Sequence, residues 1–182
     1  MSRFAVFIDG GYLSQVLKEE FHETPIDFTL LLGRIAVGSK EMLRAYYYDC
    51  LPYQSPRPTR DESERFAKHQ RFHKALTHIP RFQVQLGRLA RRHYDDGRVY
   101  YEQKRVDILF GVDLVQLAAK AQIEDAVLIA GDSDLLPAIV AAKAAGVAVH
   151  LYHGATPHTD LVGCCDERTR IDAAFIAAVR RR

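Results

Sequence analysis

The sequence predicts a three-layer α/β/α domain in which helices cover both faces of a central, mainly parallel sheet. Short apolar runs rich in β-branched and aromatic residues alternate with longer helical stretches, which is the pattern of βαβ units. Each run ends at a turn or a helix start, as buried parallel strands do. The chain has 182 residues, 48% of them hydrophobic, and can bury one sizeable core, so we expect a single domain over residues 1–182.

Four buried strands are expected, and they lie at 3–9, 43–50, 126–131 and 147–152. The helical stretches lie at 11–22, 27–37, 61–78, 107–122 and 134–145, with a C-terminal helix at about 172–181. The stretch 82–103 differs, because Asp96 and Gly97 supply a turn between two strand-like runs. It predicts a β-hairpin that extends one edge of the sheet.

Composition excludes several classes of protein. No apolar run approaches the roughly 20 residues of a membrane span, and the first residues are too quickly acidic for a signal peptide. We therefore expect a cytoplasmic protein without a membrane partner. Cys164 and Cys165 are adjacent and Cys50 is distant, which fits neither a disulfide framework nor a spaced zinc set, so we expect thiols.

The formal net charge of +2 conceals an uneven distribution. From Gln54 to Arg105 there are 13 Lys or Arg against 6 Asp or Glu, a net charge of +7, which leaves −5 for the remainder. Such a stretch can follow a phosphate backbone or can be an ordinary solvated helix face, and both interpretations stay open. The candidate phosphate contacts are Arg65, Lys68, Arg71, Arg88, Arg91, Arg92 and Arg105.

Four aspartates are expected at one edge of the sheet. Asp9 ends the first strand, and Asp132 and Asp134 follow the strand at 126–131. Asp107 opens the helix that leads into that strand. In an open parallel sheet, ligands bind outside the carboxyl ends of the strands, where loops and helix N-termini converge. We therefore expect the four carboxylates to gather there.

Converging carboxylates repel one another unless a cation neutralises them. An all-oxygen set without nearby Cys or His favours Mg²⁺ or Mn²⁺ over zinc, as one ion or two. Two such ions about 3.5 to 4 Å apart can activate a water and stabilise the leaving oxygen of a phosphodiester. The predicted reaction is phosphodiester hydrolysis.

Each aspartate also has a structural interpretation. Asp134, and less easily Asp132, can cap the helix at 134–145, and Asp107 can cap its own helix. Asp9 is harder to explain in this way, because it ends a buried strand before Gly-Gly. Asp113 is offset by about 120° and about 9 Å along the helix from Asp107, so it is at best an outer, supporting residue.

Three segments of the chain resemble a known family. "FAVFIDGGYL", "KRVDILFGVDLVQLA" and "VLIAGDSDLLPAIVAAKAAGVAVHLY" are similar, in order and spacing, to the signature blocks of the NYN domain, in the LabA-like group of the PIN-like nuclease superfamily. The resemblance covers roughly residues 3–155. It implies a metal-dependent ribonuclease with a parallel sheet, an acidic pocket and RNA as its partner, and the endo or exo mode of cleavage stays open. DNA as a further substrate and a homo-oligomer stay open.

The resemblance assigns roles by motif. Asp9 matches the aspartate of the first strand, and Asp107 matches the aspartate of a Lys-x-x-Asp block whose lysine is Lys104. Asp132 and Asp134 match the Gly-Asp-x-Asp block. The same four aspartates are thus the expected catalytic residues and metal ligands.

One position departs from the family pattern. Many members have Asn three residues after the first aspartate, where this chain has Tyr12. If that Asn helps to hold metal or water, the present chain cleaves weakly or binds differently. The supporting candidates are Tyr12, Ser133, Lys104 and Asp113. Lys104 and Arg105 are equally well explained as phosphate ligands or as counter-charges to the acidic pocket.

Two histidines have a spacing that can bind zinc. His69 and His73 are four residues apart on the predicted helix at 61–78. No HExxH pattern accompanies them, so we expect a solvated helix face.

Three classes of function therefore compete. The first is a metal-dependent ribonuclease, and the second is an RNA-binding or regulatory module that keeps the pocket but has lost turnover. The third is a phosphohydrolase of haloacid-dehalogenase type. That chemistry needs a second aspartate two positions after the first, where this chain has Gly11.

Overall fold

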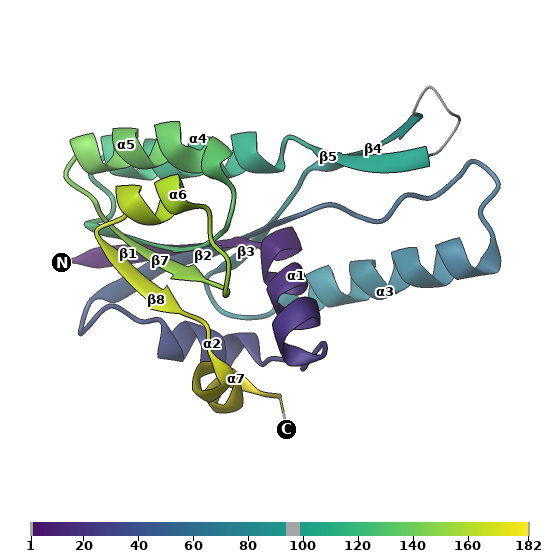
Figure 1. Cartoon of the computed structure of the whole chain (residues 1–182), viewed down its shortest axis with the longest axis horizontal. Coiled ribbons are helices and arrows are strands. Elements are labelled where there is room, and N and C mark those ends of the chain that lie inside the picture. Colours follow the sequence, from purple (N-terminus) through teal and green to yellow (C-terminus); the bar gives the residue numbers. More distant parts are fainter. Residues whose placement is uncertain (1, 94–98, 182) are drawn as a thin grey trace.

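A six-stranded parallel sheet forms the centre of the computed structural model, which describes residues 2–93 and 99–181 (Figure 1). The strand order is β3-β2-β1-β6-β7-β8. The strands are β1 (Arg3–Asp9), β2 (Glu41–Asp49), β3 (Phe82–Leu86), β6 (Asp125–Ile129), β7 (Ala148–His153) and β8 (Glu167–Arg170). All neighbouring pairs are parallel. The predicted three-layer α/β/α fold is confirmed.

Helices cover both faces of the sheet (Figure 1). One layer contains α1 (Gly10–Phe21), α2 (Phe28–Arg34), α3 (Arg60–Leu76) and α7 (Ala173–Val179). The other contains α4 (Val106–Ala119), the 3₁₀ turn η1 (Ser133–Leu135), α5 (Leu136–Ala144) and α6 (Thr159–Cys164). Strand β1 supplies both cores, because Phe4, Val6 and Ile8 pack on the first layer and Ala5 and Phe7 on the second. A central parallel strand is apolar on both faces for this reason.

The hairpin begins later than the sequence indicated, and it forms a separate two-stranded sheet instead of extending an edge of the main one. The structure pairs β4 (Arg88–His93) with β5 (Val99–Lys104) in antiparallel register, starting at Arg88↔Lys104. The residues expected as its first arm form β3 instead, which joins the main sheet beside β2. Gly87 separates β3 from β4, and its N–H donates to the Asp49 carbonyl at 2.8 Å. The predicted turn at Asp96 and Gly97 lies outside the described residues.

Two elements near the C-terminus had no clear sequence signal. Strand β8 pairs with β7 although its four residues are all exposed and polar. Helix α6 is only six residues long. The other predicted elements are present with shifted ends, and the helix expected at 134–145 starts as η1 before α5.

None of the helices in residues 2–93 and 99–181 combines the length and the apolar character that crossing a membrane requires. Cys50, Cys164 and Cys165 are thiols, as expected.

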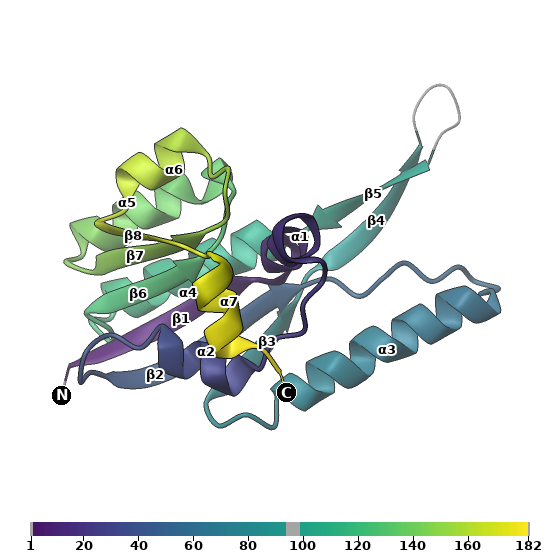
Figure 2. The same cartoon turned by 60° about the horizontal axis from the view of Figure 1, so that its bottom comes forward.

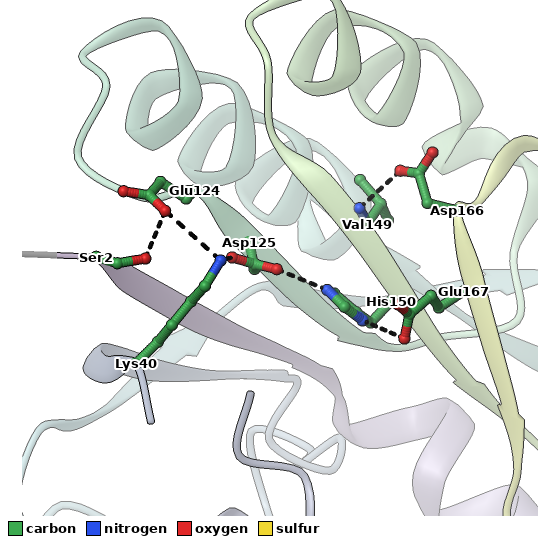
Figure 3. Close-up of polar contacts among 8 residues, drawn as sticks. All are labelled: Ser2, Lys40, Glu124, Asp125, Val149, His150, Asp166 and Glu167. Atoms are coloured by element: carbon green, nitrogen blue, oxygen red, sulfur yellow. Dashed lines mark hydrogen bonds and ion pairs between the residues drawn. The ribbon is translucent and has the colours of Figure 1, made fainter. Parts of the chain in front are cut away.

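A charged network ties the amino-terminal ends of the strands together (Figure 3). Asp125 is only 4% exposed and forms an ion pair with Lys40 through Oδ2. Its Oδ1 lies 2.8 Å from Nε2 of His150, whose Nδ1 lies 3.0 Å from Glu167 of the edge strand β8. The network therefore connects the residues before β2 with β6, β7 and β8.

Asp125→Ala should lower the free energy of unfolding by about 2 kcal/mol, because it removes a buried carboxylate that two polar groups use. Urea unfolding followed by circular dichroism measures the change. Glu167→Gln is the matched control, since Glu167 is an exposed member of the same network and should change stability by less than about 0.5 kcal/mol. Equal effects from the two variants would contradict a buried anchoring role for Asp125.

Candidate active site

The carboxyl end of β1 fixes Asp9. This residue is the last of the strand and the N-cap of α1, where its Oδ1 accepts the N–H of Tyr12 at 3.0 Å. The next residue is Gly10, where an added Cβ would lie 2.5 Å from the ring of Tyr47. Only glycine therefore lets α1 start this close to β2, and the start of α1 determines where the Asp9 carboxylate lies.

Asp132 and Asp134 follow β6 as expected, but their capping roles are reversed. Asp132 is the N-cap of η1, and its Oδ1 accepts the N–H of Asp134 at 2.9 Å. Asp134 lies inside η1, and the helix α5 that follows has no side-chain cap. Pro137 lies in the first turn of α5, where a residue without a backbone N–H is tolerated. The carboxylate of Asp134 is therefore not used as the cap that the sequence suggested.

Asp107 is also not an N-cap. It lies within the first turn of α4, and the N-cap position is Arg105, which has a left-handed backbone (φ 75°) and no side-chain capping bond. The capping interpretation of Asp107 is wrong, because α4 begins one residue before it.

A cavity of about 660 Å³ lies at the carboxyl edge of the sheet. Its lining includes three of the predicted aspartates, Asp9, Asp107 and Asp132, together with Gly11, Tyr12, Gln15, Gly131, Ser133, Thr156 and His158. Asp134 is outside the lining, but its charge acts on Asp107. The structure thus brings the four aspartates into one electrostatic neighbourhood.

Burial and mutual repulsion perturb these carboxyl groups. Burial, together with the neighbouring carboxylates of Asp107 and Asp49, raises the pKa of Asp9 to about 6 against the hydrogen bond from Tyr12. Burial also raises the pKa of Asp107, with additional contributions from Asp132 and Asp134. Oxygen-only donors that repel one another fit a hard divalent cation such as Mg²⁺ or Mn²⁺.

In EDTA, the wild-type protein should lose stability relative to Asp9→Asn as the pH rises. The folded-state pKa of Asp9 is raised above its ordinary value of 3.8 to about 6. The contribution of this carboxyl group to the free energy of unfolding is therefore fully present below about pH 3.8 and is lost as the pH rises through 6. Between pH 5 and pH 8 the difference in unfolding free energy should shift by about 1 kcal/mol in favour of Asp9→Asn. Urea titrations at the two pH values measure it, and a pH-independent difference would refute the raised pKa.

Tyr12 bridges two loops at this edge. Its ring packs on Gly131, where an added Cβ would lie 2.1 Å from Cε2 of the tyrosine. Its hydroxyl accepts the N–H of Gly154, beyond β7, at 2.9 Å. The tyrosine therefore lines the cavity and also holds the loop after β7 against α1.

Of the other supporting candidates, one lines the cavity and one has a structural role. Ser133 lines the cavity. Asp113 is outside the lining and accepts the Tyr48 hydroxyl at 2.9 Å, so it supports the packing of α4 on β2. The side chains of Lys104 and Arg91 lie outside the part of the chain that the structure describes.

The remaining basic candidates are exposed on two arms. Arg65, Lys68 and Arg71 lie on α3, whereas Arg88 and Arg92 belong to β4 and Arg105 precedes α4. Helix α3 and the β4–β5 hairpin both extend beyond the carboxyl edge of the sheet (Figure 2). The two arms thus flank the side of the molecule where the aspartates gather.

Three polar residues line the cavity without having been predicted there: Gln15 of α1, and Thr156 and His158, which follow β7. The last two had a signal in the sequence. The polar segment after the strand expected at 147–152 was a usable signal, since that strand ends at the same edge.

His73 is not on a solvated face, and that expectation is wrong. It is 6% exposed, and its Nε2 lies 2.8 Å from Oδ2 of Asp49, at the end of β2. The C-terminal half of α3 packs on the sheet, which buries His73 with Leu76. Burial lowers the pKa of its neighbour His69, against the opposing charge of Asp49.

One comparison with known proteins supports the NYN-domain part of the resemblance. The family model of the NYN domain matches residues 3–172. No curated protein and no solved structure matches the chain.

Proposed function

Because the chain belongs to the NYN domain family, we propose that it is a metal-dependent endoribonuclease of the LabA-like group in the PIN-like nuclease superfamily. The observation that carries this proposal is the gathering of Asp9, Asp107 and Asp132 around one cavity, with Asp134 beside it. The raised pKa values of Asp9 and Asp107 support it, because burial and, to a smaller extent, the neighbouring carboxylates disfavour the ionised form of both groups when no cation is bound.

Asp9, Asp107, Asp132 and Asp134 would hold one or two Mg²⁺ or Mn²⁺ ions. When bound, such ions lower the pKa of a water and stabilise the charge on the leaving oxygen of a phosphodiester. The chain itself positions the carboxylates, since backbone N–H groups hold one oxygen of Asp9 and one of Asp132. Ser133, Thr156 and His158 add polar groups around the space that a phosphodiester would occupy.

RNA is the proposed substrate, with DNA as the alternative. The exposed basic residues of α3 and of the hairpin supply sequence-independent phosphate contacts on both arms. Tyr101 of β5 is 50% exposed and lies against Tyr53, with ring centroids 5.3 Å apart and the ring planes tilted by 38°. The exposed ring offers an aromatic surface to an unpaired base.

The direct test is cleavage of labelled RNA and single-stranded DNA in Mn²⁺ or Mg²⁺, with EDTA as the control. RNA cleavage that EDTA abolishes supports the proposal. Cleavage of DNA alone would show that DNA, and not RNA, is the substrate. Hydrolysis of p-nitrophenyl phosphate without cleavage of either nucleic acid would favour the small-molecule phosphohydrolase.

A second candidate function is an RNA-binding module with little or no turnover. Tyr12 favours it, because its ring lines the cavity at the position where similar chains have Asn. The hydrogen bond that its hydroxyl accepts from the N–H of Gly154 also holds the tyrosine side chain in this position.

Tyr12→Asn separates the two candidates. If the tyrosine restricts turnover, the variant should cleave RNA at least about 10-fold faster, which is a change of about 1.4 kcal/mol in the barrier. Tyr12→Phe is the control, because it keeps the ring and loses only the hydrogen bond to Gly154. Single-turnover cleavage measures the rates, and Tyr12→Asn no faster than Tyr12→Phe would show that the ring does not limit the reaction.

A further inference from the structure

A second group of metal-binding side chains lies beside the acidic cavity, outside its lining. Asp49 ends β2, and His69 and His73 lie one turn apart on α3. Each offers one ligand atom, and these atoms lie within 4.8 Å of one another. Tyr48, the residue before Asp49, is the register partner of Asp9. The group is therefore at the same edge of the sheet, one strand away from the predicted aspartates.

The hydrogen bonding of this group is incomplete. His69 and His73 each have a buried Nδ1 without a hydrogen-bond partner in the residues that the structure describes. His73 as a whole is 6% exposed. Buried polar atoms in folded proteins are nearly always paired, and an orphaned one points to a missing ion, water or ligand. The cluster thus contains buried imidazole nitrogens whose hydrogen bonding the described residues leave incomplete.

We infer that Asp49, His69 and His73 bind a transition-metal ion of the Zn²⁺ class. Imidazole nitrogens favour Zn²⁺, Co²⁺ and similar ions over Mg²⁺ and Mn²⁺, which prefer oxygen ligands. Two histidines at positions i and i+4 of one helix plus a carboxylate form a three-ligand set, which leaves a fourth position open. The site goes beyond the proposed nuclease function and does not depend on it.

The geometry needs little adjustment to accept such an ion. Tetrahedral Zn²⁺ with bonds of about 2.0 to 2.2 Å separates its ligand atoms by about 3.4 Å. The ligand atoms lie within 4.8 Å of one another, so no pair has to close by more than about 1.4 Å, and the pair of Asp49 Oδ2 and His73 Nε2 at 2.8 Å has to open by about 0.6 Å. The Asp49 carboxylate is already oriented, because its Oδ1 accepts the N–H of Cys50 at 2.7 Å. Its Oδ2 then faces Nε2 of His73 at 2.8 Å. The ion would replace the proton in that hydrogen bond.

The two histidines border cavities. His73 lines one of about 520 Å³ with Leu51, Gln70, Arg71 and Leu86, and His69 lines a second one of about the same volume. These cavities give an ion a route to the imidazoles, whereas Asp49 is outside both linings. A site of three protein ligands with an open fourth position differs from a structural zinc site, in which all four ligands come from the protein.

Co²⁺ is the probe that tests the inference, because its visible spectrum reports nitrogen ligation and low coordination number. With millimolar Mg²⁺ present to fill the acidic cavity, the wild-type protein should bind one Co²⁺ and develop visible absorption, and calorimetry should give the same stoichiometry. His69→Gln should weaken binding by more than the roughly 10- to 100-fold that loss of a second-shell partner costs. This histidine is only partly buried, so the variant should fold, which its circular dichroism melt checks.

Two control variants place the ion. His78→Gln removes an exposed imidazole just beyond α3 and should leave Co²⁺ binding unchanged. Asp9→Asn should also leave it unchanged, whether or not that variant cleaves RNA. No visible absorption with the wild-type protein, or equal binding by His69→Gln, would overturn the inference. Loss of the Co²⁺ spectrum in Asp9→Asn would overturn it as well, since the ion would then belong to the acidic cavity.

Discussion

Replacing Asp9 with asparagine should abolish metal-dependent RNA cleavage while RNA binding persists. Asp9 ends β1 at the cavity, and its carboxylate is the most buried of the predicted set. Asparagine keeps the size of the side chain and an oxygen for the N–H of Tyr12, but it removes the charge that a divalent cation needs. Divalent ions contribute several kcal/mol of charge stabilisation in such reactions, so the rate should fall by at least about 100-fold.

RNA binding should stay the same or become tighter in Asp9→Asn, because the change removes a negative charge and no phosphate contact. Single-turnover cleavage and filter binding, measured on the same RNA, separate the two effects. Asp113→Asn is the matched control, since Asn still accepts the hydroxyl of Tyr48 and lies outside the cavity. Wild-type cleavage by Asp9→Asn would remove this carboxylate from the catalytic set.

The same substitution has a readout that does not need activity. Metal that binds only the folded protein raises the melting temperature, so millimolar Mn²⁺ should stabilise the wild type. Asp9→Asn and Asp132→Asn should show a smaller shift. An unchanged melting curve of the wild type in millimolar Mn²⁺ would argue against a site that binds Mn²⁺ at these concentrations.

The edge of the sheet where the aspartates lie could be predicted, because the carboxyl ends of parallel strands lie at the same edge whatever the exact strand boundaries are. Once "FAVFID" and "AVLIAG" were assigned as buried parallel strands, Asp9 and Asp132 had to follow at the same edge. The capping pattern could not be predicted in this way. Whether Asp132 or Asp134 receives the N–H depends on a single 3₁₀ turn, and helix boundaries are ambiguous by one or two residues.

Other features depended on long-range packing that the local sequence pattern does not show. Strand β8 has four exposed polar residues and is a strand only because the edge of β7 offers it hydrogen bonds. Strand β3 is short, and only Gly87 separates it from β4, so the two runs looked like one hairpin arm. The inner face of α3 carries His69 and His73 beside Leu76, which gives it too little apolar periodicity to be recognised as buried.

The basic residues of α3 should set the salt dependence of RNA binding. Arg65, Lys68 and Arg71 are exposed on the arm that extends beyond the carboxyl edge of the sheet (Figure 2). Each phosphate that such a residue neutralises releases counterions, which contributes about 0.7 to the slope of log affinity against log salt for single-stranded RNA. Replacing all three with Gln should therefore flatten the slope by up to about 2 units. The deficit relative to the wild type should be largest at low salt and shrink by about 10-fold between 50 and 200 mM.

The effect should be similar for unrelated RNA sequences, because phosphates carry no sequence information. Replacing Lys120, Arg168 and Arg170 with Gln is the matched control, since it removes the same charge from exposed positions away from α3. Fluorescence anisotropy at several salt concentrations measures all three proteins. If the α3 variant and the control have the same slope, α3 is only a solvated face, and the phosphate contacts must come from the hairpin side, where Arg88, Arg92 and Arg105 are exposed.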